Sequence, residues 1–396
     1  MKINSIQYVK NLKGKKILIR VDYNVTLGKN NTLGEEDDAR IRMSLPTIKF
    51  LLKKKSIPVI LAHRGRPEGK VVETLRLNPL ADRLTHLLKK KVIQLDSCTG
   101  YEIENKIKKS KIGDIFILEN LRFDPREEKN SDDFSQKLAG LGDMYVNDAF
   151  SNSHRKHASM VGITKFLPSY AGLLMEKEIK QLSKSWENPK RPLATIIGGA
   201  KISTKLGLIK KFMDVSDFVL VGGALANMIL KAKGVSIGKS VIEESMIKKV
   251  KEIKLTSTKL HIPLDVITSD SPDSLALPKT KAVGKVLDDE YILDLGPDTI
   301  ELFSSIIKKS KTIIWNGPMG YVENRHFQKA TKKIMEVVLR SRADVIIGGG
   351  DSLKMIGHKK MNKNIFLSSG GGAMLEFLEF GMLPAIVPLL LKNNKT

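Results

Sequence analysis

The sequence has little cysteine, few aromatic residues and no long apolar run. Among 396 residues the single cysteine, Cys98, excludes an intramolecular disulfide framework and any multi-cysteine zinc or iron–sulfur site. No stretch approaches the roughly 18 consecutive apolar residues of a membrane-spanning helix. The first residues, Met1 to Asn4, include no apolar signal segment. We therefore expect a cytoplasmic protein without a membrane partner.

Several signatures of nucleotide and metal sites are missing as well. No Gly-x-Gly-x-x-Gly motif follows a strand-like run, which leaves a dinucleotide site unsupported. The segment Gly234–Ser240 is one residue too short for a phosphate-binding P-loop, and it follows a helical pattern. We interpret it as a loop between helices. His154 and His157 lack zinc-ligand spacing, and Cys98 is expected to be buried and inert.

Negative charge is scarce: 67 Lys and Arg stand against 43 Asp and Glu, a formal charge of +24. Such a surface attracts nucleic acids, acidic lipids or phosphorylated metabolites. The lysines are scattered, however, and short runs such as Lys53–Lys55 and Lys89–Lys91 follow helical patterns, where the helix dipole favours cations. Arginine and aromatic residues are not interleaved as in a base-stacking surface. We favour a lysine-rich surface; binding of RNA or an anionic surface stays as the alternative function.

Short apolar runs alternate with helical patterns along the chain, which predicts an α/β fold with two Rossmann-like domains. In each we expect a mostly parallel sheet covered by helices on both faces. The strand-like runs are Ile17–Val21, Pro58–Leu61, Ile115–Leu118, Met144–Val146, Leu193–Ile197, Phe218–Val221, Ile313–Trp315, Val345–Ile347 and Ile365–Leu367. We predict an N-terminal domain over 1–174, a linker helix and hinge over 175–192, a C-terminal domain over 193–380, and a tail over 381–396 that packs back on the first domain.

In the first half, polar and cationic residues follow the strand-like runs. They are Asp22, Asn24, His63, Arg64, Arg66, Arg122, His154 and Arg155. A lone arginine at a strand end is usually part of a surface salt bridge. Several at one edge of a parallel sheet would form a basic site for a small, multiply anionic ligand, because arginine binds phosphate and carboxylate through two hydrogen bonds.

In the second half, glycines follow the strand-like runs. The segments are Gly198–Lys201, Gly222–Gly223, Asn316–Pro318, Gly348–Asp351 and Gly370–Gly372. Glycine lets backbone N–H groups approach phosphate, and helix N-termini favour negative charge. Asp351 and Ser352 fit either a helix N-cap or a Mg²⁺ site beside nucleotide phosphates. Lys201 and Lys205 are four residues apart, which places them on one helix face, with Lys205 able to reach a transferring phosphoryl group.

These segments resemble the phosphoglycerate kinase family. The matching blocks, in family order and over nearly the whole chain, are Ile19–Val25, Asp38–Arg42, His63–Pro67, Glu119–Phe123, Val146–Phe150, His154–Arg155, Gly198–Lys201, Trp315–Pro318, Gly348–Asp351 and Ser369–Ala373. The resemblance implies reversible phosphoryl transfer between ATP and the carboxylate of 3-phosphoglycerate, a glycolytic reaction. It also implies Mg²⁺ bound with the nucleotide, hinge bending between two domains, and no nucleic-acid partner; a monomer is the default expectation.

The resemblance also assigns residues. Catalysis would involve Arg40, Lys205, Gly371 and Gly372, and the phosphoglycerate would be held by Asp22, Tyr23, Asn24, Arg40, His63, Arg64, Gly65, Arg66, Arg122 and Arg155. The nucleotide would be held by Gly199, Lys201, Lys205, Gly222, Asn316, Pro318, Glu323, Gly349, Gly350, Asp351 and Ser352, with Asp351 toward the metal.

The departures from the family pattern are mild. Tyr23 stands where Phe is usual, Thr26 where Pro is common, and Ser352 where Thr is common. Ser151–Ser153 replaces a more usual Gly-Thr-Ala, and Arg64 stands where Leu is common; we expect Arg64 to face solvent. None removes a charge or donor assigned above, so an inactive relative that keeps the fold is disfavoured.

Overall fold

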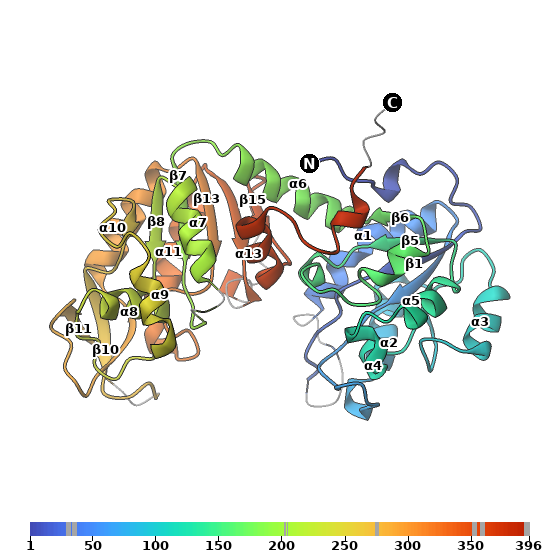
Figure 1. Ribbon diagram of the computed structural model, residues 1–396, viewed down its shortest axis with the longest axis horizontal. Coiled ribbons are helices and arrows are strands. Elements are labelled where there is room, and N and C mark those ends of the chain that lie inside the picture. Colours follow the sequence, from blue (N-terminus) through green and yellow to red (C-terminus); the bar gives the residue numbers. More distant parts are fainter. Residues whose placement is uncertain are drawn as a thin grey trace. The chain divides into compact units, whose positions relative to one another are not determined.

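The computed structural model describes residues 1–28, 33, 38–201, 203, 205–273, 277–350, 355–356 and 361–391. The chain divides into two compact units (Figure 1). Unit 1 consists of Met1–Lys180 together with Phe380–Thr396, and unit 2 consists of Gln181–Glu379. The boundary falls within α6 (Leu173–Glu187), which overlaps the linker helix and hinge predicted over 175–192.

Unit 1 contains a six-stranded parallel sheet. In spatial order its strands are β3 (Ile93–Gln94), β4 (Phe116–Ile117), β2 (Ile57–Leu61), β1 (Lys16–Arg20), β5 (Met144–Asn147) and β6 (Ser169–Ala171). Its helices are α1 (Ala39–Lys53), α2 (Asn78–Leu88), α3 (Tyr101–Lys108), α4 (Pro125–Glu128) and α5 (Asp132–Ala139).

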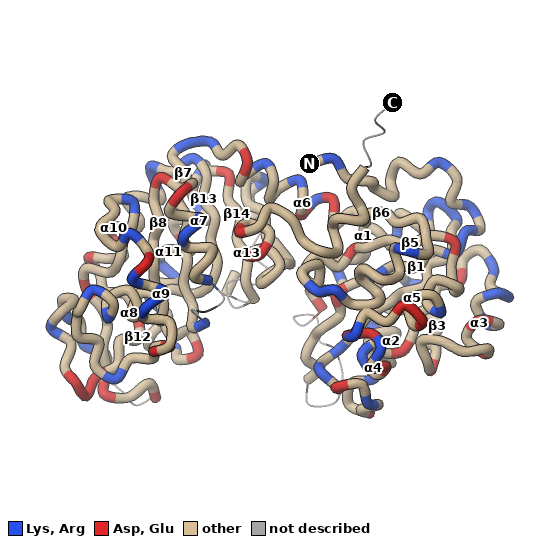
Figure 2. Tube along the Cα trace, viewed as in Figure 1, with Lys and Arg blue, Asp and Glu red and all other residues tan. Residues whose placement is uncertain are grey.

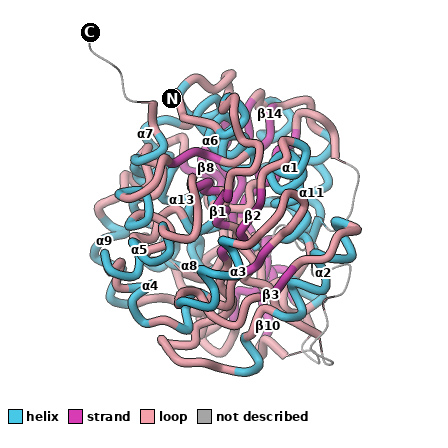
Figure 3. Tube along the Cα trace, turned by 90° about the vertical axis from the view of Figure 1, so that its right-hand side faces the viewer, coloured by secondary structure: helices cyan, strands magenta, loops and turns pink. Residues whose placement is uncertain are grey.

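The side chains of β1 alternate between two hydrophobic layers, as the two-residue period of a strand requires. Ile17 and Ile19 pack in one cluster with residues of α1 and α2, whereas Leu18 packs in another with residues of α3 and α5. In Figure 3, α1 and α2 lie to one side of β1 and β2, and α5 lies to the other. Both faces of the central strands are therefore buried.

Unit 2 contains a second parallel sheet and a smaller antiparallel one. The parallel sheet runs β15 (Ile365–Leu367), β14 (Asp344–Gly348), β13 (Thr312–Asn316), β7 (Leu193–Ile197), β8 (Phe218–Val221) and β9 (Leu260–His261). The antiparallel sheet runs β11 (Lys279–Ala282), β10 (Asp265–Ser269) and β12 (Tyr291–Leu295). The helices are α7 (Leu206–Val215), α8 (Gly223–Ala232), α9 (Ile247–Lys251), α10 (Pro297–Lys309), α11 (Lys329–Arg340) and α13 (Gly371–Phe380). Two mostly parallel sheets flanked by helices confirm the predicted fold class.

The C-terminal segment contacts the beginning of the chain inside unit 1. The backbone N–H of Asn4 donates to the carbonyl oxygen of Leu389 at 2.8 Å, and that of Ala385 donates to Ser153 at 3.1 Å. Ile386 and Leu389 are fully buried. Residues 381–391 thus complete the hydrophobic interior of unit 1.

Charge is spread over the surface of each unit. Figure 2 shows lysine and arginine on many helices and loops, with acidic residues among them. Basic residues lie in the last turn of α1 (Lys53) and of α10 (Lys308 and Lys309). There their positive charge interacts favourably with the negative end of the helix dipole. No helix in the described ranges is long and apolar enough to span a membrane.

Candidate active site: an arginine cluster and a glycine-rimmed cavity

In unit 1, the loops after four parallel strands carry the cationic residues to one edge of the sheet. Asp22 and Asn24 follow β1, His63 follows β2, Arg122 lies in the turn after β4, and Arg155 follows β5. Because parallel strands end at the same edge, these side chains gather there. The sequence-based prediction of a basic site rested on this geometry.

Hydrogen bonds hold the loops of this edge together. Asn24 Oδ1 accepts from the backbone N–H of Gly65 at 2.9 Å, and Arg122 Nη1 donates to the carbonyl oxygen of Gly65 at 2.8 Å. The fully buried Asn120 accepts at Oδ1 from the backbone N–H groups of Arg64 and Arg122, both at 3.2 Å. One amide thus fixes the loops after β2 and β4.

Asp22 and Arg40 form an ion pair, in which Nη1 of Arg40 donates to Oδ2 of Asp22. Ser151 Oγ donates to the same carboxylate oxygen. Ser151 departs from the family pattern and is not among the predicted site residues, so this contact was not predicted from the sequence. The side chain of Arg40 is 41% exposed and so remains accessible to a ligand.

Two arginines of the cluster retain buried N–H groups without partners among the described residues. These are Nη2 of Arg122 and Nε of Arg155. Burial lowers the pKa of Arg122 to about 10, although the nearby carboxylate of Glu128 acts in the opposite direction. Buried, unpartnered donors cost free energy, and an anionic ligand is the group that would satisfy them.

Three other predicted residues differ in exposure. Arg66 is exposed. Arg64 is only 7% exposed, and its head group donates to the carbonyl oxygens of Val25 and Arg76, both at 3.3 Å. The expectation that Arg64 faces solvent is therefore wrong, because its guanidinium points inward and donates hydrogen bonds to backbone carbonyl oxygens. The Tyr23 side chain is fully buried, with its hydroxyl 2.8 Å from Ser44 Oγ, which leaves its backbone for ligand contact.

In unit 2, glycine-rich strand ends surround a cavity of about 600 Å³. This volume is in the range of sites for small molecules and cofactors. Of the predicted nucleotide residues, those in the lining are Gly199, Lys201, Lys205, Asn316, Pro318, Glu323, Gly349 and Gly350; Gly371 and Gly372, at the start of α13, also line it. Gly222 does not line it, but its neighbour Gly223 does. Asp351 and Ser352 lie outside the described residues.

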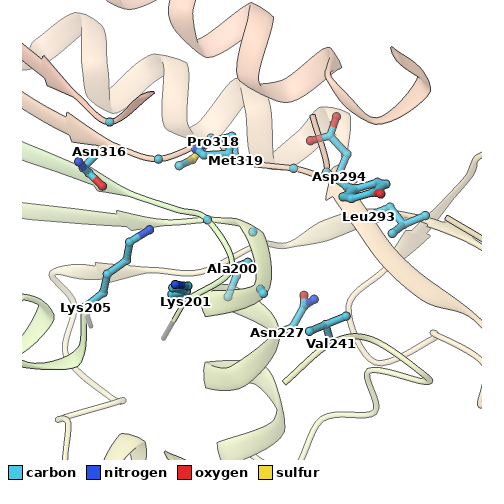
Figure 4. A pocket seen from close by; sticks show the side chains of 18 of the residues that line it. Ala200, Lys201, Lys205, Asn227, Val241, Leu293, Asp294, Asn316, Pro318 and Met319 are labelled. Atoms are coloured by element: carbon cyan, nitrogen blue, oxygen red, sulfur yellow. The ribbon is translucent and has the colours of Figure 1, made fainter. Parts of the chain in front are cut away.

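The amine of Lys205 is directed back toward the strand ends (Figure 4), where Nζ donates to the carbonyl oxygen of Gly198. Lys205 directly precedes α7 and Lys201 lies in the loop before it. The prediction that both share a helix face is wrong, because Lys201 and Lys205 both precede Leu206, the first residue of α7. Asn316 is 5% exposed, and its Nδ2 has no hydrogen-bond partner among the described residues.

Part of the lining comes from residues that were not predicted from the sequence. Among them are Ala224, Asn227, Val241, Tyr291–Leu295, Met319, Tyr321 and Leu375. In Figure 4 the carboxylate of Asp294 points away from Ala200 and Asn227. Its Oδ2 accepts from the backbone N–H of Ala330, in the first turn of α11, at 3.0 Å. Burial raises the pKa of Asp294 to about 7.

The two sites lie in separate units, and each suits an anionic ligand. Comparison with known proteins gives them a common context. The family model described as phosphoglycerate kinase matches residues 6–380. The phosphoglycerate kinase of Dictyoglomus turgidum is 45% identical over 389 residues, and that of Gloeothece citriformis is 42% identical over 387; each alignment covers 96% of both chains.

Solved structures agree with these relatives. Phosphoglycerate kinase from Coxiella burnetii has a TM-score of 0.84 at 35% identity, and that from Pyrococcus horikoshii OT3 has 0.85 at 30%; each covers 98% of both chains. The alternative function, binding of RNA or an anionic surface, is not supported by these relatives. With a family match over nearly its whole length and the same fold as the solved enzymes, this chain belongs to the phosphoglycerate kinase family.

Proposed function

We propose that the arginine cluster of unit 1 binds 3-phosphoglycerate and that the cavity of unit 2 binds ATP or ADP. The reaction is the one the family catalyses in glycolysis, ATP-dependent phosphoryl transfer on 3-phosphoglycerate. The observation that carries the assignment is the pair of unpartnered, buried donors on Arg122 and Arg155 at one sheet edge. A phosphate group would accept from both.

The remaining residues of unit 1 take roles by the same reasoning. Asp22 would accept from the substrate hydroxyl and Asn24 would support it, while His63 and Arg66 would contact the phosphate with Arg122 and Arg155. Arg40, paired with Asp22 and partly exposed, would face the reacting carboxylate. Arg64 and Gly65 would shape the loop between them.

The chemistry needs no protein base. A carboxylate with a pKa near ~3.5 is already ionised at neutral pH. The protein must hold two anions in line and offset the charge on the transferring group. We assign this to Arg40, to Lys205 and to the backbone N–H groups of Gly371 and Gly372.

We propose that Mg²⁺ enters with the nucleotide. The described residues contain no group of three or more potential metal ligands, which suits an ion held mainly by phosphate oxygens and one carboxylate. Asp294 does not suit this role, because its carboxylate accepts from the start of α11. Asp351 would be the ligand. Bound Mg²⁺ would neutralise phosphate charge during transfer.

Three further proposals concern the protein in solution. The two substrates bind in different units, so transfer requires a hinge motion, which we place at residues 175–192; closure also excludes water. Small-angle scattering with and without both ligands tests the hinge motion, and an unchanged radius of gyration would refute it.

We also propose that the protein is cytoplasmic and monomeric.

The function itself is tested by a coupled assay on purified protein with ATP, Mg²⁺ and 3-phosphoglycerate. Wild type should turn over, and Arg40→Ala and Lys205→Ala should each lower kcat about 10²–10³-fold, the typical effect of removing one transition-state donor. Lys210→Ala is the matched control, because Lys210 lies on α7 and pairs with Glu252 at the surface. Absence of turnover by wild type would refute the proposal.

A further inference from the structure

A chain of buried hydrogen bonds lies beneath the arginine cluster of unit 1. Arg20, the last residue of β1, is only 1% exposed and donates through three nitrogens. Its Nε donates to Ser159 Oγ at 2.9 Å, its Nη1 to the carbonyl oxygen of Val21, and its Nη2 to Nδ1 of His63 at 2.9 Å. The proposed function above gives Arg20 no role.

The contact with Arg20 fixes the tautomer of His63. A guanidinium has only N–H donors and no acceptor, so Nδ1 of His63 must be the acceptor. The ring proton of the neutral imidazole is then on Nε2. An imidazolium would direct a second N–H at the donor of Arg20. Burial, then the charges of Arg20, Arg122 and Arg155, lower the pKa of His63 well below its usual value.

Glu127 and Ser159 in turn orient Arg20. Ser159 Oγ donates to Glu127 Oε1 at 2.6 Å, and the backbone N–H of Ser159 donates to Oε2 at 2.9 Å. A lone pair of Ser159 Oγ is therefore left for Arg20 Nε. Glu127 and Ser159 are fully buried, and Tyr145 OH donates to the carbonyl oxygen of Ser159 at 2.7 Å. The carboxylate also supplies the opposite charge that a buried arginine needs.

We propose that Arg20 is a positioning residue that holds His63 as an Nε2–H donor for the anionic substrate. The opposite tautomer would present a lone pair to an anion held by Arg122 and Arg155. The inference rests on the proposed function, because a bound anion is what makes the donor useful. Arg20 itself acts through His63 and does not need to touch the ligand.

The tautomer is measurable without activity. In the full chain labelled with ¹⁵N-histidine, two-bond ¹H–¹⁵N correlation spectra distinguish protonated from unprotonated ring nitrogens, and His63→Gln assigns the signals. At pH 7 we expect Nε2 protonated and Nδ1 unprotonated in wild type. Arg20→Met should give a mixture of tautomers and a higher His63 pKa. Arg126→Met, which removes an arginine paired with Asp124 and Asp133, should leave the signals unchanged.

The wild-type spectrum is decisive even where Arg20→Met does not fold. A proton on Nδ1, or an imidazolium at pH 7, would overturn the inference. Ser159→Ala provides a second variant that keeps Arg20 but removes the acceptor of its Nε. It should shift the His63 signals in the same direction as Arg20→Met, and unchanged signals in both folded variants would also overturn the inference.

A double-mutant cycle separates positioning from simple loss of charge. Arg20→Met should raise KM for 3-phosphoglycerate about 10-fold, the effect of roughly one hydrogen bond, with KM for ATP unchanged. In a His63→Gln background, the same change should raise that KM less than about 3-fold. Equal factors in both backgrounds would show that Arg20 acts by charge alone. An inactive wild type would refute the proposed function, while the spectra would still report the tautomer.

Discussion

The amine of Lys205 lies where a side chain at Gly199 would begin. The amine of Lys205 is bonded to the carbonyl oxygen of Gly198, and a Cβ at Gly199 would lie 2.6 Å from that amine. Gly199 also has a φ of +96°, in the region that favours glycine. The position of the loop and the position of the amine therefore depend on each other.

Gly199→Ala should displace the Lys205 amine and lower kcat at least about 10-fold, while the strained φ costs roughly 1–2 kcal/mol of stability. The matched control is Gly234→Ala, because Gly234 has a φ of +80° and nothing within 4 Å of a Cβ. Both variants should lose similar stability in urea titrations, and only the first should lose activity in the coupled assay. Equal activities would contradict the dependence of Lys205 on Gly199.

Ser151→Ala should weaken binding of 3-phosphoglycerate. Ser151 and Arg40 donate to the same oxygen of Asp22, so removing the hydroxyl leaves the carboxylate less well oriented. We expect KM for 3-phosphoglycerate to rise about 3–10-fold, in keeping with one hydrogen bond. KM for ATP should not change. Ser110→Ala, which removes a hydroxyl bonded to Ile107 at the end of α3, is the control and should behave as wild type.

Asp294 should make the stability of unit 2 depend on pH. Burial raises its pKa to about 7 from the ordinary 3.8 of an aspartate, so the folded state binds more protons than the unfolded state between these values. The free energy of unfolding should then rise as pH falls from about 7 toward 4, relative to Asp294→Asn.

Both tryptophans, Trp186 and Trp315, lie in unit 2, so tryptophan fluorescence in urea titrations follows this unit. A constant difference between wild type and Asp294→Asn across this pH range would show that Asp294 does not titrate there.

His157 should have the opposite effect in unit 1. Burial, then the charges of Arg122, Arg20 and Arg155, lower its pKa to about 3 from 6.5. The unfolded state therefore binds more protons between these values, and the free energy of unfolding should fall as pH falls below about 6.5.

His157→Gln should reduce this acid sensitivity. Far-UV circular dichroism follows both units, and subtracting the transition seen by tryptophan fluorescence isolates unit 1. An unchanged pH profile in His157→Gln would count against the prediction.

The nine apolar runs recognised in the sequence all become strands, because strands buried on both faces of a parallel sheet are nearly continuous in apolar residues. The antiparallel sheet of β10, β11 and β12 was missed. Strand β11 carries Lys279 and Lys281 and is mostly exposed, so its pairing with β10 leaves no hydrophobic pattern to recognise. The strands β3, β6 and β9 were missed as well, because each has only two or three residues.

The site was predictable where it depends on strand ends. Asp22, His63 and Arg122 follow apolar runs, and parallel pairing brings them together. The walls of the cavity were not predictable, because Asn227 and Leu293 come from a helix and an antiparallel strand distant in sequence. Arg20 was missed because an arginine inside a strand is recognisable as buried only from its partners, Ser159 and His63.

The return of residues 381–391 to unit 1 has a consequence for biosynthesis. Unit 2 is one uninterrupted stretch, whereas unit 1 needs Ala385, Ile386 and Leu389 from beyond it. On the ribosome, domains fold as their residues emerge. Most of unit 1 is translated first, but part of its interior stays uncovered until all of unit 2 and then residues 381–391 have left the exit tunnel.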